Sequence, residues 1–572
     1  MKEENSKINN LLNLAKEAIQ LKDYNKAKDF FKKVISINKN IPEVHNNLGL
    51  INLNLNNLKE SEESFNKAIK LKPEFPFAFS NLGIVYDRLG NFKKSEENYL
   101  QSIFLDKKNF ITHYNLGNLY KDQNDLVNAE KYYKSALDLK PDMIETYKNL
   151  FFIYNRSNQL RKLEEILVKA KINLGNHSIV NFFQGIYDFE NKDFQAVIKN
   201  FEKLKIEKKE VGVISIKNEL LAKSYDNISE YEKSFKFFSE ANNLIYQIYK
   251  NKYKKENYID LVNQRIKYYL KLDIKKWNIE FPKQNDPTFL VGFPRSGTTL
   301  LDTILRTHNS VEVIEEKPIV EEFVDDLKNR INNDFTKLEN INQKFYNEMR
   351  NIYFKKRNKY VKLDKNKINN DFTKLEKINL KFYNEMRNIY FEKRNKYVKL
   401  DKNKIYVDKL PLNLIFIGEI YRFFPNAKFI FAIRNPYDTV LSCFMQQFTP
   451  NEAMMNFTNL DDASKFYDLS MTLYKKYFEL FKLNIFEIKY EDVVNDFDTS
   501  IKKLLKFLDL EWEESIKEFY ITASKRGIIS TPSFNQVNKP IYKKSINRWK
   551  NYEHKFKNIK PKLSKWITEF KY

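Results

Sequence analysis

A short loop rich in glycine and hydroxyl residues carries the clearest chemical signal in this sequence. Residues 289–291 are apolar and predict a buried strand, and residues 292–299 read GFPRSGTT. A strand that turns tightly through glycine into a helix directs backbone N–H groups and a helix N-terminus at an anion, usually a phosphate. The spacing from Gly292 to Gly297 fits the first half of a Walker A loop, but Thr298 stands where the phosphate-binding lysine of that motif belongs. The sequence therefore predicts a phosphate cradle unlike that of a magnesium-dependent NTPase.

A second candidate for anion binding lies further along the chain. The apolar run 428–433 predicts another strand, Arg434 follows it, and Ser442 lies in the helix expected over residues 437–448. Ligands of parallel sheets bind at the carboxyl ends of the strands, so Arg295 and Arg434 can reach one crevice. The planar fork of arginine binds phosphate through two hydrogen bonds.

The elements that must position these residues differ between the two halves of the chain. From about residue 286, strand-like apolar runs alternate with helical stretches, which predicts an α/β domain built on a parallel sheet. Before that point, the triplet Asn-Leu-Gly recurs every 34 residues, at positions 47–49, 81–83 and 115–117. An aromatic residue recurs at the same interval, at Phe31, Phe65, Tyr99 and Tyr133.

A 34-residue period of helix pairs resembles the tetratricopeptide repeat. One helix pair cannot bury its apolar face alone, but stacked pairs share a continuous core. We expect about six or seven repeats. The predicted fold is an α-solenoid over residues 1–250, a helical linker over 251–285 and an α/β domain of the P-loop-like type over 286–572.

The Pro-Arg-Ser-Gly-Thr-Thr loop resembles the 5′-phosphosulfate loop of sulfotransferases, which use 3′-phosphoadenosine-5′-phosphosulfate (PAPS). The Arg-x7-Ser spacing of Arg434 and Ser442 resembles the family's 3′-phosphate site, and the Glu315-Glu316 pair resembles the protein-tyrosine sulfotransferase branch. The resemblance covers about residues 286–325 and 405–550. It implies that these residues bind the cofactor: Arg295, Ser296, Gly297, Thr298, Thr299, Arg434, Ser442, Tyr490 and Arg548.

The same resemblance implies catalytic roles for four residues. Glu316 would be the general base that accepts the proton of the acceptor hydroxyl. Arg295 and Lys409 would stabilise charge that develops as the sulfuryl group is transferred, and Ser533 would assist them. We see no set of carboxylates arranged for a metal ion, so no metal is expected.

Between the two blocks of resemblance lies a tandem duplication. Residues 331–367 recur at 368–404 with three differences in 37 positions. The segment lacks glycine and proline, and its apolar residues fall near helical spacing. We hypothesise that one copy packs on the edge of the sheet and the other forms an additional helical excursion, with a substrate gate as the alternative.

Bulk composition limits the remaining possibilities. The net charge of +24 arises from 99 Lys and Arg residues against 75 Asp and Glu residues, spread along the whole chain, so we expect no nucleic-acid partner. Cys443 is the single cysteine, which excludes an intrachain disulfide and fits a reducing compartment. The sequence shows no signal peptide and no run of 18 apolar residues, so we expect a cytoplasmic protein without a membrane span.

The predicted function is therefore transfer of a sulfuryl group from PAPS to an acceptor hydroxyl. The acceptor stays open among a protein tyrosine, a glycan, a lipid and a small molecule, and the repeats are expected to bind a peptide or protein. Two alternatives remain, namely a phosphotransferase of the P-loop kinase type and a non-catalytic repeat scaffold with a degenerate nucleotide-binding domain.

Overall fold

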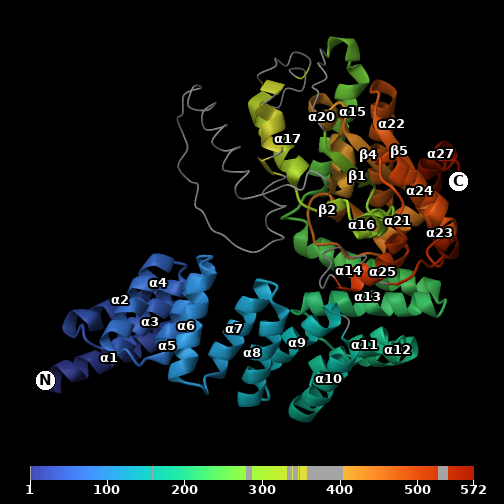
Figure 1. The fold of residues 1–572 in the computed structure, drawn as a ribbon. Helices are drawn as coiled ribbons and strands as arrows, with labels where there is room; N and C mark the ends of the chain where they lie inside the picture. The colour runs from blue at the N-terminus through green and yellow to red at the C-terminus, as the bar shows by residue number, and fades with distance from the viewer. Residues whose placement is uncertain are drawn as a thin grey trace. The chain divides into compact units, whose positions relative to one another are not determined.

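The computed structural model divides into two compact units, Met1–Lys205 and Ile206–Tyr572 (Figure 1). It describes the chain except for residues 1, 158, 278–285, 332–337, 339–344, 347, 354, 357–403, 526–536 and 538. In the described part of the chain, no helix is both long enough and apolar enough to cross a bilayer.

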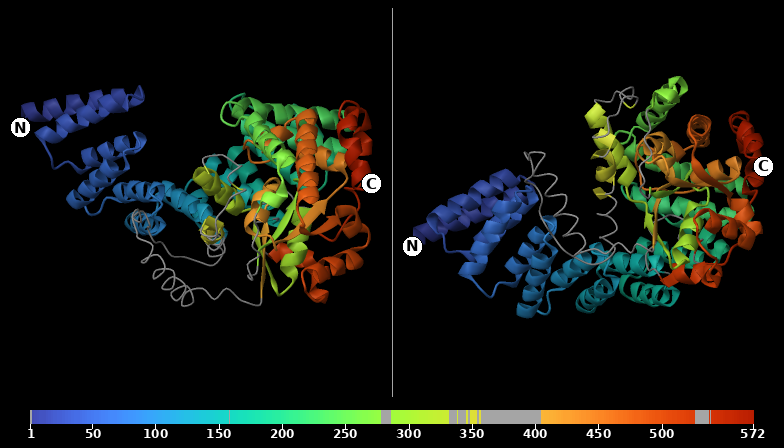
Figure 2. Two further views of the ribbon diagram at one scale, coloured as in Figure 1. Left: turned by 90° about the horizontal axis from the view of Figure 1, so that it is seen from above. Right: turned by 45° about the horizontal axis from the view of Figure 1, so that its top comes forward.

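The first unit consists of helices that pair with their neighbours in the chain, and the pairs follow one another in sequence order (Figure 2). This confirms the predicted stack of helix pairs. Its helices are α1 Lys2–Gln20, α2 Tyr24–Ile37, α3 Pro42–Asn54, α4 Leu58–Leu71, α5 Pro76–Arg88, α6 Phe92–Leu105, α7 Phe110–Asp122, α8 Leu126–Leu139, α9 Ile144–Arg156, α10 Leu160–Leu174, α11 Ser178–Glu190 and α12 Phe194–Lys203.

The two sequence periods of the repeats meet in the interior of the helix pairs that contain the periodic glycine, such as α5/α6 and α7/α8. A Cβ atom placed on Gly83 would lie 2.6 Å from the ring of Tyr99, and one on Gly117 would lie 2.7 Å from the ring of Tyr133. Each glycine therefore leaves the space that the aromatic ring of the partner helix fills, which explains why both recur every 34 residues.

The second unit begins with three helices, α13 Val211–Asn227, α14 Tyr231–Tyr249 and α15 Lys255–Lys271, followed by the 3₁₀ turn η1 Ile274–Lys276. Phe238 of α14 and Val262 of α15 belong to the same buried cluster as Phe289 and Phe431 of the sheet. The two compact units meet at residue 205, because these helices bury their apolar faces against the sheet domain, and the predicted bounds of 1–250, 251–285 and 286–572 stay a prediction.

Five parallel strands form one sheet in the order β2-β3-β1-β4-β5. The strands are β1 Thr288–Gly292, β2 Val311–Glu315, β3 Ile405–Lys409, β4 Lys428–Ile433 and β5 Asn484–Lys489. β2 and β3 lie on one side of β1. β4 and β5 lie on its other side. Loops that leave β1 and β4 diverge at this point, which creates the crevice in which such sheets bind ligands.

Helices cover both faces of the sheet. Phe289 and Phe429 point to one apolar core, while Leu290 and Ile430 point to the other, so alternate strand residues are buried on opposite faces. The remaining helical elements are α16 Thr298–Thr307, α17 Ile319–Ile331, η3 Pro411–Phe416, α20 Ile417–Phe423, α21 Pro436–Phe444, η4 Met454–Phe457, α22 Leu460–Leu480, α23 Tyr490–Asn495, α24 Phe497–Phe507, η5 Glu514–Glu518, α25 Phe519–Lys525, η6 Arg548–Phe556 and α27 Lys560–Glu569.

The described residues of the first copy of the duplicated segment are part of the sheet domain. Tyr353 is buried and donates a hydrogen bond from its Oη to Oδ2 of Asp408 at 3.0 Å. Arg350 is buried as well and pairs with Asp286 at 2.6 Å. The second copy lies outside the described residues, apart from Lys404, so the hypothesis about its placement stays a prediction.

Candidate active site

Each of the five strands supplies one site residue at its carboxyl end. Arg295 lies in the loop after β1, Glu316 directly follows β2, and Lys409 is the last residue of β3. Arg434 directly follows β4, and Tyr490 directly follows β5. Residues that are far apart in the sequence thus meet along one edge of the sheet.

The loop after β1 has the conformation that an anion cradle requires. Gly297 adopts a left-handed conformation, with φ of 101°, and caps α16 without a side-chain hydrogen bond. The first N–H groups of α16 are therefore available to a ligand. Ser296 Oγ is buried and has no hydrogen-bond partner among the described residues, which marks a polar atom suited to a bound anion.

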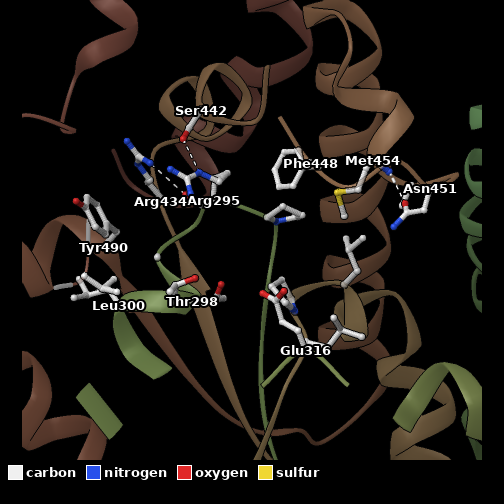
Figure 3. Close-up of a pocket in the computed structure, with 18 of the residues that line it drawn as sticks. Arg295, Thr298, Leu300, Glu316, Arg434, Ser442, Phe448, Asn451, Met454 and Tyr490 are labelled. Carbon is white, nitrogen blue, oxygen red and sulfur yellow. Dashed lines mark hydrogen bonds between the residues drawn. The ribbon is translucent and has the colours of Figure 1, made fainter. Parts of the chain in front are cut away.

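The guanidinium groups of Arg295 and Arg434 lie together above this loop (Figure 3). Arg295 Nε donates to Ser442 Oγ at 3.0 Å, while Arg434 donates to the backbone oxygen of Arg295 at 3.2 Å. The guanidinium carbon of Arg434 also lies 5.0 Å from the centre of the Tyr490 ring. Nε of Arg434 is buried and has no hydrogen-bond partner among the residues that the structure describes.

The electrostatics of these two arginines favour a negatively charged ligand. Burial, together with the charge of Arg434, lowers the pKa of Arg295 to about 10. Arg295 is thus still protonated at neutral pH, although its positive charge and that of Arg434 lie close together in a buried environment. A ligand that carries several negative charges would remove this repulsion.

Lys409 and Glu316 form an ion pair on the other side of the loop. The Nζ atom of Lys409 lies 2.7 Å from Oε1 of Glu316, and the lysine side chain is fully buried, whereas that of Glu316 is 31% exposed. The backbone supports this pair, because the N–H of Glu316 donates to the carbonyl oxygen of Lys409 at 2.7 Å. The arrangement holds a carboxylate and an ammonium group at adjacent strand ends, with Glu316 lining the cavity and Lys409 buried behind it.

A cavity of about 730 Å³ connects these groups. Arg295, Arg434, Ser442 and Tyr490 lie on one side of the cavity, Phe448, Met454 and Asn451 lie on the other side, and Glu316 lies below these three in the view of Figure 3. The volume is within the range of nucleotide and cofactor pockets. The cavity therefore has a cationic end next to a part that Glu316 and both apolar and polar side chains line.

Most residues predicted for the site reach this cavity. Gly297, Thr298 and Thr299 line it together with Arg295, Glu316, Arg434, Ser442, Tyr490 and Arg548. Ser296 and Lys409 are buried beside it through the loop and the ion pair described above. Ser533 lies outside the described residues.

Asp438 is a residue of the site that the sequence reasoning missed. It lies in the first turn of α21 and is almost completely buried. Its carboxylate accepts backbone N–H groups from Asn547 at 2.7 Å and Trp549 at 2.8 Å, and burial raises its pKa. The sequence contained a clue to Asp438, because Arg434, Asp438 and Ser442 follow one another at intervals of four residues. That spacing places side chains on one face of a helix, here α21 and the residues that lead into it.

Comparison with known proteins supports this assignment of domains. Residues 287–514 match the model of the sulfotransferase family, and residues 8–41, 42–75 and 110–143 match models of the tetratricopeptide repeat. An uncharacterized protein of Aquifex aeolicus (strain VF5) is 24% identical over 344 residues, which is 58% of this chain and 39% of that protein.

Two functionally described relatives match a shorter part of the chain. Cytosolic sulfotransferase 15 of Arabidopsis thaliana is 25% identical over 154 residues, which is 25% of this chain and 42% of the relative. Protein-tyrosine sulfotransferase 2 of Gallus gallus is 24% identical over 146 residues, which is 25% of this chain and 39% of the relative. The chain thus spans about two fifths of the length of these relatives. It combines N-terminal tetratricopeptide repeats with a C-terminal domain of the sulfotransferase family, which is distantly similar to tyrosine and cytosolic sulfotransferases.

Proposed function

We propose that the sheet domain transfers a sulfuryl group from PAPS to the hydroxyl group of an acceptor. The meeting of Arg295 and Arg434 at the ends of β1 and β4, beside the buried and unsatisfied Ser296 Oγ, carries this proposal. PAPS has a phosphosulfate at its 5′ end and a phosphate at its 3′ position. These anionic groups would neutralise the charges of Arg295 and Arg434 and accept hydrogen bonds from the donors along the crevice.

The residues of the cationic end fit the donor nucleotide. Ser296, Thr298, Thr299 and the N-terminus of α16 would hold the 5′-phosphosulfate. Arg434 and Ser442 would hold the 3′-phosphate, for which the guanidinium fork is suited. Tyr490, whose ring lies beside both Gly297 and Arg434, would contact the nucleoside.

When PAPS is bound, it supplies the sulfuryl group. The acceptor oxygen would form a bond to sulfur while the bond between sulfur and the 5′-phosphate oxygen breaks, leaving adenosine 3′,5′-bisphosphate. The Glu316 carboxylate takes the proton of the acceptor hydroxyl. Lys409 and Arg295 place positive charge where negative charge develops on the bridging and sulfuryl oxygens.

A tyrosine of a peptide or protein is the acceptor that we propose first. The similarity to a protein-tyrosine sulfotransferase of Gallus gallus supports it, and tetratricopeptide repeats commonly bind peptides. Glycan, lipid and small-molecule hydroxyls are the competing acceptors, because the donor site does not determine the acceptor.

The proposal is tested by incubating the protein with PAPS that carries sulfur-35 and with a cell extract separated into protein, glycan, lipid and small-molecule fractions. We expect label to enter one fraction without added magnesium, and the protein fraction if the acceptor is a tyrosine. Transfer of phosphate from ATP, or no transfer of label to any fraction, would contradict the proposed reaction.

A further inference from the structure

One wall of the cationic end of the cavity comes from a segment near the C-terminus. Ile541, Tyr542, Ser545 and Arg548 line the cavity, and residues 541–547 form neither a helix nor a strand. We call residues 541–549 the closing segment. Because residues 541–547 belong to no helix or strand, the position of the segment depends on contacts with other elements.

The sheet domain holds the backbone of the closing segment at two places. Arg434 donates to the carbonyl oxygen of Ser545 at 2.6 Å. The two oxygens of Asp438 accept the N–H groups of Asn547 and Trp549. Asn547 adopts a left-handed conformation, with φ of 59°, which brings both N–H groups to one carboxylate. These bonds hold the backbone at residues 545, 547 and 549, and a further contact holds the segment through the guanidinium group of Arg548.

The partner in this contact is Asp226 near the end of α13. Oδ2 of Asp226 lies 2.8 Å from the guanidinium NH2 of Arg548, and Oδ1 accepts a hydrogen bond from Tyr552 Oη at 2.6 Å. Tyr552 is fully buried, and its Oη accepts a hydrogen bond from the hydroxyl group of Ser234 of α14 at 2.9 Å. The side chain of Asp226 is 9% exposed and that of Arg548 is 29% exposed, so the contact is partly buried and is shielded more than an ion pair on the open surface.

We propose that Asp226 is a positioning residue for the donor site: it holds the Arg548 guanidinium group at the wall of the cavity. Arg548 is the third arginine of the cationic end, and its charge also acts on Arg295. Without Asp226, repulsion from Arg295 and Arg434 favours other orientations of Arg548, and the bound nucleotide loses one cation. This inference rests on the proposed function, and it assigns a role to a helix that precedes the residues matched by the sulfotransferase family.

The test compares full-length variants in titrations with adenosine 3′,5′-bisphosphate and in turnover of PAPS. We expect Asp226→Asn to raise the Kd of the bisphosphate and the KM for PAPS about tenfold, as for loss of one charge-assisted hydrogen bond, with kcat changed less than about threefold. Asp226→Glu should restore part of the affinity, because it keeps the charge.

A matched control lies on the next helix, α14, which also pairs with η6. Glu232 of α14 pairs with Lys555 at 2.8 Å and with His554, and these residues do not line the cavity. Glu232→Gln should leave both constants at their original values. In an Arg548→Ala background, Asp226→Asn should have no further effect, since Asp226 acts through Arg548. An unchanged Kd for Asp226→Asn, or an equal additional loss in the Arg548→Ala background, would overturn the inference.

A measurement without ligand separates this inference from the proposed function. If the unaltered protein does not bind the bisphosphate, the proposed function fails, and hydrogen exchange of the closing segment still tests Asp226. Asp226→Asn should speed exchange in residues 543–549 while the melting temperature stays within about 3 °C, and Tyr552→Phe should speed it less. Unchanged exchange in that segment would show that Asp226 does not position it.

Discussion

Arg295 and Arg434 differ in what holds them, although both belong to the cationic end of the cavity. Arg295 lies in the loop after β1 in a left-handed conformation, with φ of 68°, and donates to Ser442. Arg434 donates hydrogen bonds to the backbone of the loop after β1 and of the closing segment, and it lies over the ring of Tyr490. Substituting the two should therefore have different consequences, with Arg295 affecting turnover and Arg434 affecting donor binding.

Arg434→Ala should mainly raise the KM for PAPS, by about tenfold or more, because two charge-assisted contacts of the donor site are lost. Steady-state kinetics with varied PAPS would measure this. Since Arg434 also fixes Ser545, the same variant should weaken binding of adenosine 3′,5′-bisphosphate. An unchanged KM would remove Arg434 from the donor site.

Lys409→Ala and Arg295→Ala should each lower kcat by about a hundredfold or more, because each removes a positive charge that stabilises the transition state. Lys409→Ala also removes the partner of Glu316 at 2.7 Å, so circular dichroism must show that the fold is retained. The assignment of both residues would be withdrawn if single-turnover rates with PAPS stayed at their original values.

Sequence reasoning identified the strand-end residues better than the residues that support them. Arg295 and Arg434 come after apolar runs that could be recognised as strands, so their meeting could be predicted from the rule for parallel sheets, whereas Glu316, Lys409 and Tyr490 were predicted from the family resemblance. The contact of Asp226 with Arg548 joins residues more than 300 positions apart, and nothing in the local sequence of either residue reports it. Such contacts depend on tertiary packing alone.

The elements of the first unit follow from the repeat period, while those of the second unit were harder to recognise. The glycine and aromatic periods predicted the helix pairs because each ring fills the space that a glycine leaves. In contrast, α13 to α15 continue a weakened repeat pattern but bury their apolar faces against the sheet domain. A periodic pattern shows which face of a helix is buried, but not which partner buries it.

Gly83→Ala should destabilise the repeat unit by about 1–3 kcal/mol, because its Cβ would lie 2.6 Å from the Tyr99 ring. Thermal unfolding followed by circular dichroism would measure the loss. Gly212→Ala in α13 is the matched control: no atom lies within 4 Å of the added Cβ, so this variant should unfold at the same or a slightly higher temperature. Equal behaviour of the two variants would contradict the close packing of the repeats.

Deleting residues 368–404 should leave stability and turnover nearly unchanged, because the first copy of the duplicated segment already packs in the core through Arg350 and Tyr353. Deleting both copies, 331–404, should destabilise the domain, since it leaves Asp286 and Asp408 buried without these partners. The melting temperatures of the two deletion variants, each compared with that of the full chain, test this prediction. A large loss in the single deletion would show that the second copy has a role of its own.

At the scale of the whole molecule, the compact unit that contains the sheet begins earlier in the chain than the match to the family does. The matched residues start at 287, whereas α13 and α14 supply Asp226 and part of the apolar core of the sheet domain. A protein that consists of residues 206–572 should fold and bind adenosine 3′,5′-bisphosphate like the full chain. One that starts at residue 251 should be unstable or should bind the nucleotide more weakly.

Solubility, circular dichroism and nucleotide titration of these two truncated proteins would test the boundary. If the shorter protein kept the full stability and the full affinity for the nucleotide, the sheet domain would not need α13 and α14. These helices would then belong with the repeats.

The central claim is that the crevice at the strand ends holds a nucleotide with phosphate groups at both its 3′ and its 5′ positions. The most direct test is calorimetric titration of the full-length protein with adenosine 3′,5′-bisphosphate and with AMP, in the presence of EDTA. The account predicts binding of the bisphosphate without a metal ion and with at least about tenfold higher affinity than AMP, because the 3′-phosphate adds charge-assisted hydrogen bonds. Equal affinity for the two nucleotides, or no binding of the bisphosphate, would contradict it.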